Sequence, residues 1–236
     1  MTNNLRVVLF DVDGTLIKTV RRREYRGLIH AMLLDIFGTC GRINEVDFAG
    51  KTDLAIYREA LESEGITPAG IRERLPMIEE ATVGILNHLR ATGDVFELCP
   101  GVRDLLEALG ADSTFMPSLL TGNVERLAEA KLRVAGIWHY FKSRGAFGSD
   151  DENRDHLPAI AAERINLEIG YPLAPDRFVI VGDTPRDISC ARHFGARVLA
   201  VASGQHTVDQ LKAFSPDALL PDLSDTSSVI SLLAEI

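Results

Sequence analysis

The feature that most constrains the fold of this chain is a set of short, continuous apolar runs that each end at a polar turn. Such runs are typical of strands buried on both faces, because a half-buried strand alternates apolar and polar residues. Four stand out, at residues 7–10, 119–120, 178–181 and 197–201. Apolar residues at helical spacing lie between them, over 102–109, 124–132 and 160–165. Strand and helix therefore alternate, which predicts an α/β fold with a Rossmann-like, doubly wound parallel sheet.

Residues 18–96 depart from this alternation. Apolar residues recur there at helical spacing over 25–36, 54–61 and 78–89, and each stretch stops at or before a glycine. We therefore predict an α/β core made of residues 1–17 and 97–236, with an inserted α-helical bundle, the cap domain, at 18–96. Pro117 cannot donate to a central ladder and is predicted to mark the start of its strand.

Composition narrows the functional classes. The 25 basic and 34 acidic side chains give a net charge of −9, which opposes capture of nucleic acid or another polyanion. No apolar run approaches the roughly 18 residues of a membrane span, and the first run is too short for a signal peptide. We therefore expect a cytoplasmic protein without a nucleic-acid or membrane partner. The three cysteines lack the spacing of a zinc or redox site.

Two carboxylates follow the first apolar run directly. Asp11 and Asp13 are two residues apart, so in extended chain both point out of the edge where open α/β sheets bind ligands. Carboxylates this close repel each other unless a cation lies between them, and this favours an oxygen-seeking ion such as Mg²⁺. An acidic turn that closes a strand is the alternative.

A second pair of carboxylates follows the run at 178–181 and is expected at the same edge of the sheet. Asp183 can complete a metal site with Asp11. Asp187 is either a ligand through water or a group that orients the site, or else a charge favoured by a helix dipole.

A third polar turn precedes a helix that begins near Val124. Thr121, Gly122 and Asn123 supply a hydroxyl and an unhindered backbone, and the open N–H groups of the helix start complete an anion site suited to phosphate. Taken alone, the same three residues are also explained as a helix-capping turn.

Together the segments DVDGT, LLTGN and VGDTPRD resemble, in their order, the motifs of the haloacid dehalogenase superfamily of phosphotransferases. The match covers 1–17 and about 99–205, and the helical insertion resembles the cap of the branch of phosphoglycolate phosphatase and β-phosphoglucomutase. The resemblance implies a Mg²⁺-dependent phosphatase that hydrolyses a small phosphorylated metabolite, a phosphomonoester, through an aspartyl-phosphate intermediate.

The resemblance also implies a role for each motif residue. Asp11 would be the nucleophile, and Asp13 the general acid and then the general base. Mg²⁺ would be held by the Asp11 carboxylate, the Asp13 backbone carbonyl and Asp183, with Asp187 nearby. The groups expected to hold the substrate phosphate belong to Gly14, Thr121, Gly122 and Asn123.

The superfamily pattern includes one cation against the phosphate, usually a lysine before a proline, and this sequence has no Lys-Pro pair. Arg154 stands at the corresponding place and can contact oxygens in bidentate fashion. Lys131 is the competitor, but it lies about 12 Å along its helix from the turn, so its stem must reach back. We favour Arg154 on this geometry; the alternative for Lys131 is a solvated helix face.

Lys51 lies in a Gly-Lys-Thr-Asp segment that resembles the part of the cap facing the catalytic edge, and it is a candidate substrate contact. An N-cap role explains Thr52 or Asp53 without function. Lys18 either meets a negative part of the substrate or is a solvated charge, and the arginines at 21–23 are interpreted as solvent-facing.

Three other functions compete with the phosphatase: a sugar phosphomutase on the same residues, a dehalogenase, and a non-catalytic binding module that retains the fold. Asp13 and Asp183 argue against the dehalogenase, which needs neither an acid nor a metal. The sequence predicts neither the particular substrate nor the oligomeric state.

Overall fold

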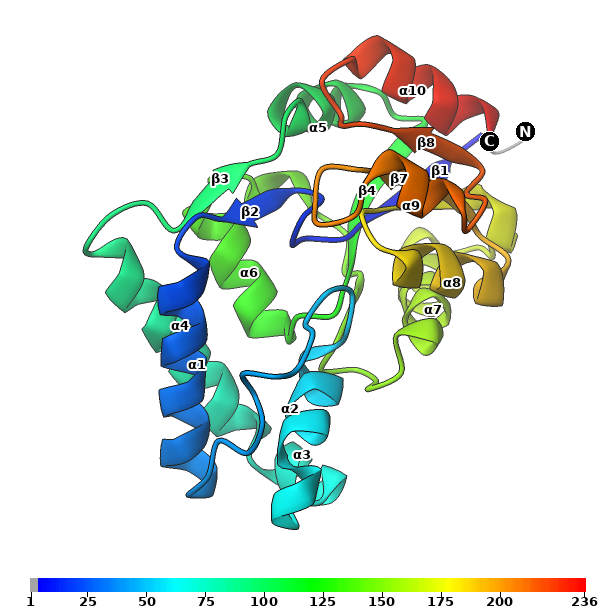
Figure 1. Cartoon of the computed structure of the whole chain (residues 1–236). Coiled ribbons are helices and arrows are strands. Elements are labelled where there is room, and N and C mark those ends of the chain that lie inside the picture. The colour runs from blue at the N-terminus through cyan, green and yellow to red at the C-terminus, as the bar shows by residue number, and fades with distance from the viewer. Residues whose placement is uncertain (1–3) are drawn as a thin grey trace.

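The structure is a computed structural model that describes residues 4–236, and a six-stranded parallel sheet forms its centre (Figure 1). The strand order is β5-β4-β1-β6-β7-β8, so the chain winds outward in both directions from β1. The strands are β1 (Arg6–Phe10), β4 (Phe115–Thr121), β5 (Ala146–Phe147), β6 (Phe178–Gly182), β7 (Arg197–Val201) and β8 (Ala218–Leu220). The predicted doubly wound α/β fold is confirmed.

Helices cover both faces of this sheet. One face is covered by α5 (Val102–Ala111), α6 (Glu125–Val134) and α10 (Thr226–Glu235), the other by α7 (Leu157–Ile169), α8 (Pro185–Phe194) and α9 (Val208–Lys212). Short 3₁₀ turns lie at η1 (Glu62–Glu64), η2 (Trp138–Tyr140), η3 (Arg154–His156) and η4 (Pro175–Arg177). Side chains of β1 alternate between the two cores, Val8 and Phe10 in one and Val7 and Leu9 in the other. Because both cores are apolar, consecutive residues of β1 are apolar and form the unbroken run seen in the sequence.

The inserted segment is helical. The chain leaves and re-enters the core through β2 (Ile17–Thr19) and β3 (Phe96–Leu98), which pair antiparallel. Between them lie α1 (Arg22–Phe37), α2 (Asp53–Leu61), α3 (Pro68–Glu73) and α4 (Leu75–Arg90). Their apolar faces enclose a separate core that includes Leu33, Leu61 and Ile78. The helices expected over 25–36, 54–61 and 78–89 are confirmed, whereas the exact domain boundaries stay a prediction.

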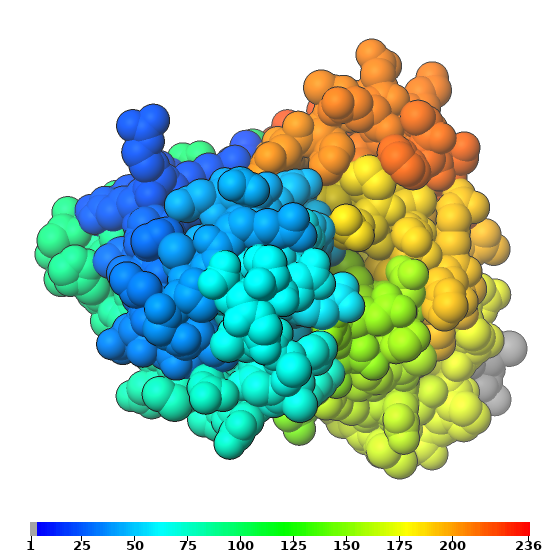
Figure 2. Space-filling view, turned by 60° about the horizontal axis from the view of Figure 1, so that its bottom comes forward, coloured from blue at the N-terminus to red at the C-terminus, as the bar shows by residue number. Residues whose placement is uncertain are grey.

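The cap lies directly against the core. Leu86 and Leu89 of α4 share a small apolar cluster with Val124 and Leu127 at the start of α6. Elsewhere along the boundary, Figure 2 shows blue-to-cyan atoms of the cap touching yellow-green and yellow atoms of the core. A cavity remains between the cap and the core, at the carboxyl ends of the strands.

The predicted start of β4 is wrong by two residues. The strand begins at Phe115, and Pro117 lies inside it, opposite Val8 of β1. Strand β5 pairs with β4 only at Leu120 and Thr121, so Pro117 has a neighbouring strand on one side only. A missing N–H is tolerated at such a position. In residues 4–236 no helix combines the length and the apolar character needed to cross a membrane.

Candidate active site

The three polar turns meet at one edge of the sheet. Asp11 follows β1, Thr121 ends β4, and Asp183 follows β6, which places all of them at the carboxyl ends of adjacent parallel strands. The backbone N–H of Asp11 donates to Val181 at 2.9 Å and fixes the first turn against β6. A cavity of about 660 Å³ opens here between core and cap. The expected residues that line it are Asp11, Asp13, Gly14, Lys51, Thr121, Gly122, Asn123, Lys131, Arg154 and Asp183.

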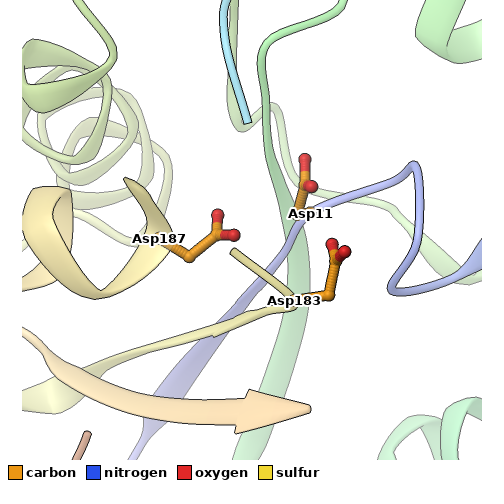
Figure 3. A group of neighbouring side chains, drawn as sticks. All are labelled: Asp11, Asp183 and Asp187. Atoms are coloured by element: carbon orange, nitrogen blue, oxygen red, sulfur yellow. The ribbon is translucent and has the colours of Figure 1, made fainter. Parts of the chain in front are cut away.

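Three carboxylates converge at the floor of this cavity. Figure 3 shows Asp187 projecting from the start of α8 toward Asp11 and Asp183, and one ligand oxygen of each lies within 4.8 Å of the others. Burial raises the pKa of Asp11 to about 6, although Arg154 opposes the shift. Burial, followed by the charge of Asp11, raises the pKa of Asp183 well above its usual value. A bound cation would stabilise the ionised form of these buried carboxylates. Their oxygen atoms are the ligand type that a divalent ion such as Mg²⁺ prefers.

Two glycines make room for the Asp183 carboxylate. A Cβ on Gly14 would lie 2.4 Å from Asp183 Oδ2, and one on Gly204 would lie 1.6 Å from it. Gly14 also has φ +92°, a conformation that other residues rarely adopt. The Gly14 carbonyl accepts a hydrogen bond from Ser203 Oγ at 2.7 Å, and Thr15 Oγ1 donates to Asp183 Oδ1 at 3.2 Å. Sequence reasoning missed Ser203 and Gly204, because only the fold brings the turn after β7 to this site.

Asp187 is fully buried, and both of its oxygens already have partners. Oδ2 accepts from Thr184 N at 3.0 Å and from Thr184 Oγ1 at 2.7 Å in the capping box of α8, and Oδ1 pairs with Arg154. The contact with Arg154 agrees with a role of Asp187 in orienting the site. The contacts with Thr184 are those of a helix cap, so both interpretations of Asp187 remain.

Arg154 joins three segments of the chain. Its guanidinium pairs with Asp187, lies 3.1 Å from Asp11 Oδ1 and donates to the carbonyl of Gly50, in the cap, at 3.2 Å. The side chain is 6% exposed, and its Nε is buried without a partner in the described part of the protein. Arg154 therefore stands beside the expected nucleophile, with one donor unused.

Lys131 also reaches the site. Its ammonium donates to Asp13 Oδ2 at 2.6 Å and to Asn123 Oδ1 at 2.7 Å, and the residue is only 4% exposed. The alternative of a solvated helix face is therefore wrong: the stem folds back along α6 toward the turn at its start. Nearby Asp13 and Tyr25 raise the pKa of Lys131 despite its burial, so the side chain is a stable cation here.

The turn before α6 differs in one respect from the anion site that was expected. Thr121 Oγ1 accepts from the backbone N of Asn123 at 3.3 Å and from its side-chain Nδ2 at 2.9 Å. The N–H groups that start the helix are not open: that of Val124 donates to Asp53 Oδ2 at 2.8 Å, and that of Glu125 to Ser149 Oγ at 3.2 Å. These partners come from distant parts of the sequence, so local reasoning did not include them.

The cap contributes charged groups to the cavity wall. The ammonium of Lys51 pairs with Glu59, although Lys51 lines the cavity. Lys18, Arg22 and Arg23 also line the cavity, and no ion pair to any of them occurs within 4–236. The cap side of the cavity is therefore more basic than acidic, although Glu45, Asp47 and Asp53 line it too.

Comparison with known proteins supplies independent information. The HAD-hydrolase-like family model matches residues 155–226. The chain is 26% identical to the probable phosphatase IndB of Dickeya dadantii, with 98% of this chain and 95% of the relative covered. It is 27% identical to a phosphoglycolate phosphatase of Pseudomonas putida, with 96% and 83% covered. A crystal structure described as a predicted phosphoglycolate phosphatase from Haemophilus somnus superposes with a TM-score of 0.66 at 18% identity, covering 98% of this chain and all of the other.

Proposed function

We propose that this chain, which is similar to phosphoglycolate phosphatases of the haloacid dehalogenase superfamily, is a Mg²⁺-dependent phosphatase of a small phosphomonoester. The observation that carries this proposal is the placement of Asp11 and Asp13 at the end of β1, with Asp183 and two buried cations around them. We further propose that the enzyme acts in the cytoplasm on a small phosphorylated metabolite. Its net charge of −9 disfavours a nucleic-acid substrate.

In the proposed first step, an oxygen of Asp11 attacks phosphorus while the bond from phosphorus to the leaving oxygen breaks. Asp13 gives its proton to that oxygen. Arg154, 3.1 Å from Asp11 Oδ1, stabilises the negative charge on the transferring group. The step yields an aspartyl phosphate and a free alcohol.

In the second step, Asp13 takes a proton from water, the water oxygen bonds to phosphorus, and the Asp11–phosphorus bond breaks. Asp13 is held for both steps by Lys131 at 2.6 Å and Asn123 at 2.7 Å. In this proposal Thr121 and the backbone N–H of Asn123, which donates to Thr121 Oγ1 at 3.3 Å in this structure, turn to the phosphoryl oxygens when substrate is bound. Inorganic phosphate is released, and Asp11 and Asp13 return to their starting states.

The metal would be held by Asp11, Asp183 and the backbone carbonyl of Asp13. When bound, Mg²⁺ supplies positive charge that keeps Asp11 ionised and offsets charge on the transferring group. We assign Asp187 to orienting Arg154 rather than to the metal, because both of its oxygens accept from other groups.

Mg²⁺ is expected to stabilise the fold more near pH 7.5 than near pH 5. The folded-state pKa of Asp11 is raised from 3.8 to about 6 by burial, so between these values the folded protein holds a proton that the unfolded chain has released. Without metal, this contribution to the free energy of unfolding falls as pH rises from about 4 to about 6. Above that range the carboxylate is free to bind the metal. Thermal unfolding with Mg²⁺ or chelator at both pH values measures the effect.

Asp183→Asn is expected to remove most of that metal-dependent rise in Tm, whereas the exposed Asp209→Asn is the matched control. An equal rise at both pH values, or an undiminished rise in Asp183→Asn, would contradict the site.

The basic cap wall supports a substrate whose leaving group carries a second anion, such as the carboxylate of a phosphorylated hydroxy acid. Removing Arg22 and Arg23 together is expected to raise KM for such esters about tenfold, the scale of one charge-assisted hydrogen bond, with little change for p-nitrophenyl phosphate. Arg90→Ala, an exposed cap arginine outside the cavity, is the control. An equal loss for both kinds of ester would count against this assignment.

A panel of small phosphomonoesters, assayed for inorganic phosphate with Mg²⁺ and with chelator, tests the proposal as a whole. The phosphatase predicts chelator-sensitive release in step with substrate loss. A phosphomutase consumes substrate without releasing phosphate in step, and a binding module leaves every ester intact.

A further inference from the structure

Helix α6, which carries Lys131, begins without a side-chain cap of its own. Its N-cap residue is Val124, which has no polar side chain. The preceding Asn123 is a residue type that often caps helices, but its amide is committed to the site, to Asp13 at 2.7 Å and to Lys131 at 2.7 Å. The start of α6 therefore depends on partners from elsewhere in the fold.

The main partner comes from the cap. Asp53 Oδ2 accepts the N–H of Val124 at 2.8 Å, and the Asp53 N–H donates to the carbonyl of Gly122 at 2.7 Å. Asp53 is the first residue of α2, but α2 is already capped by Thr52, whose hydroxyl accepts from Ala55 N at 3.1 Å. The Asp53 carboxylate is thus turned away from its own helix and serves a helix of the core.

The fit around this contact is close. A Cβ on Gly122 would lie 2.0 Å from the Lys51 carbonyl oxygen, and one on Gly148 would lie 3.2 Å from Thr52 Cβ. Thr52 Oγ1 donates to the carbonyl of Glu152 at 2.7 Å. The cap segment 50–53 is therefore seated between the turn at 121–124 and the loop at 148–154, the core segments that carry Thr121 and Arg154.

We propose that Asp53 is a positioning residue: by closing on the core, the cap completes the start of α6 and so fixes the phosphate-facing turn and Lys131. This inference rests on the proposed phosphatase function. Opening of the cap would leave the Val124 N–H and the Gly122 carbonyl without these partners. The turn and Lys131 would therefore reach their catalytic positions only when the cap is closed over a substrate. Phosphoryl transfer to water would then be slow while the cap is open.

Asp53→Ala is expected to lower kcat about 10- to 100-fold while KM changes less than threefold, because substrate contacts remain but the turn and Lys131 are no longer fixed. Asp53→Asn retains an oxygen that accepts the Val124 N–H and should restore most of kcat. Asp53→Glu, one methylene longer, should not. Asp35→Ala, which changes an exposed acidic cap residue outside the cavity, is the matched control.

Amide hydrogen exchange of Val124 and Glu125 gives a readout that does not depend on activity. Exchange at Val124 should accelerate at least about tenfold in Asp53→Ala and stay near wild type in Asp53→Asn and Asp35→Ala. If no ester is hydrolysed, the proposed function fails, while the exchange still reports whether Asp53 holds the turn. Unchanged exchange in Asp53→Ala, or a kcat within twofold of wild type, would overturn the inference.

Discussion

Replacing Asp11 by Asn is expected to lower phosphate release by at least about four orders of magnitude, the scale seen when a covalent nucleophile is removed. The amide is nearly isosteric but is a poor nucleophile and forms no acyl phosphate. Turnover should therefore fall equally for every ester in the panel. Steady-state release of inorganic phosphate with saturating Mg²⁺ measures the loss, and thermal unfolding checks that the variant is folded.

Two comparisons sharpen this test. Asp94→Asn changes an exposed aspartate that does not line the cavity and should leave kcat unchanged. Asp13→Asn should slow the steady state of every ester, because Asp13 is also the base of the second step, but p-nitrophenyl phosphate should still give an initial burst of product, because p-nitrophenolate leaves without being protonated. Metal-dependent hydrolysis that survives in Asp11→Asn would falsify the nucleophile assignment.

The sheet and the meeting of its three polar turns could be predicted because they depend on local patterns. A buried parallel strand reads as an apolar run, and parallel strands place their carboxyl ends at one edge. Asp11, Thr121 and Asp183 each follow such a run directly, so the shared edge follows from topology alone. Pro117 misled the prediction of a strand start because the sequence does not reveal where β5 stops pairing with β4.

The partners of the site residues could not be predicted, because they depend on contacts between distant segments. The ion pair of Lys131 with Asp13 and the bond from Val124 to Asp53 join residues far apart in the sequence. Helix periodicity assigns Lys131 to a position on α6 but does not say that its stem folds back. Likewise, the Gly-Lys-Thr-Asp segment marked the cap surface near the site, yet only the fold shows the Asp53 carboxylate turned toward the core.

Arg154→Met is expected to lower kcat about 100- to 1,000-fold for every ester, because it removes an electrostatic stabiliser beside the nucleophile. The guanidinium lies 3.1 Å from Asp11 Oδ1 and also pairs with the buried Asp187. Breaking buried ion pairs costs about 3–5 kcal/mol, so a lower Tm is expected as well. Arg154→Lys keeps the positive charge and should recover part of kcat. Comparing the two variants separates the effect of the lost charge on kcat from the effect of a less stable fold.

Lys131→Met is expected to behave differently, because its ammonium contacts Asp13 rather than Asp11. If Lys131 acts through Asp13, its removal should slow the first step, measured as the initial burst of product, about tenfold or more for alkyl esters and much less for p-nitrophenyl phosphate. Arg133→Met is the matched control: Arg133 is an exposed residue of the same helix, and its ion pair within residues 4–236 is with Glu129. A first step slowed by two orders of magnitude for both kinds of ester in Lys131→Met would reassign the phosphate-facing cation to Lys131, provided that Arg154→Lys and Arg154→Met are nearly unaffected.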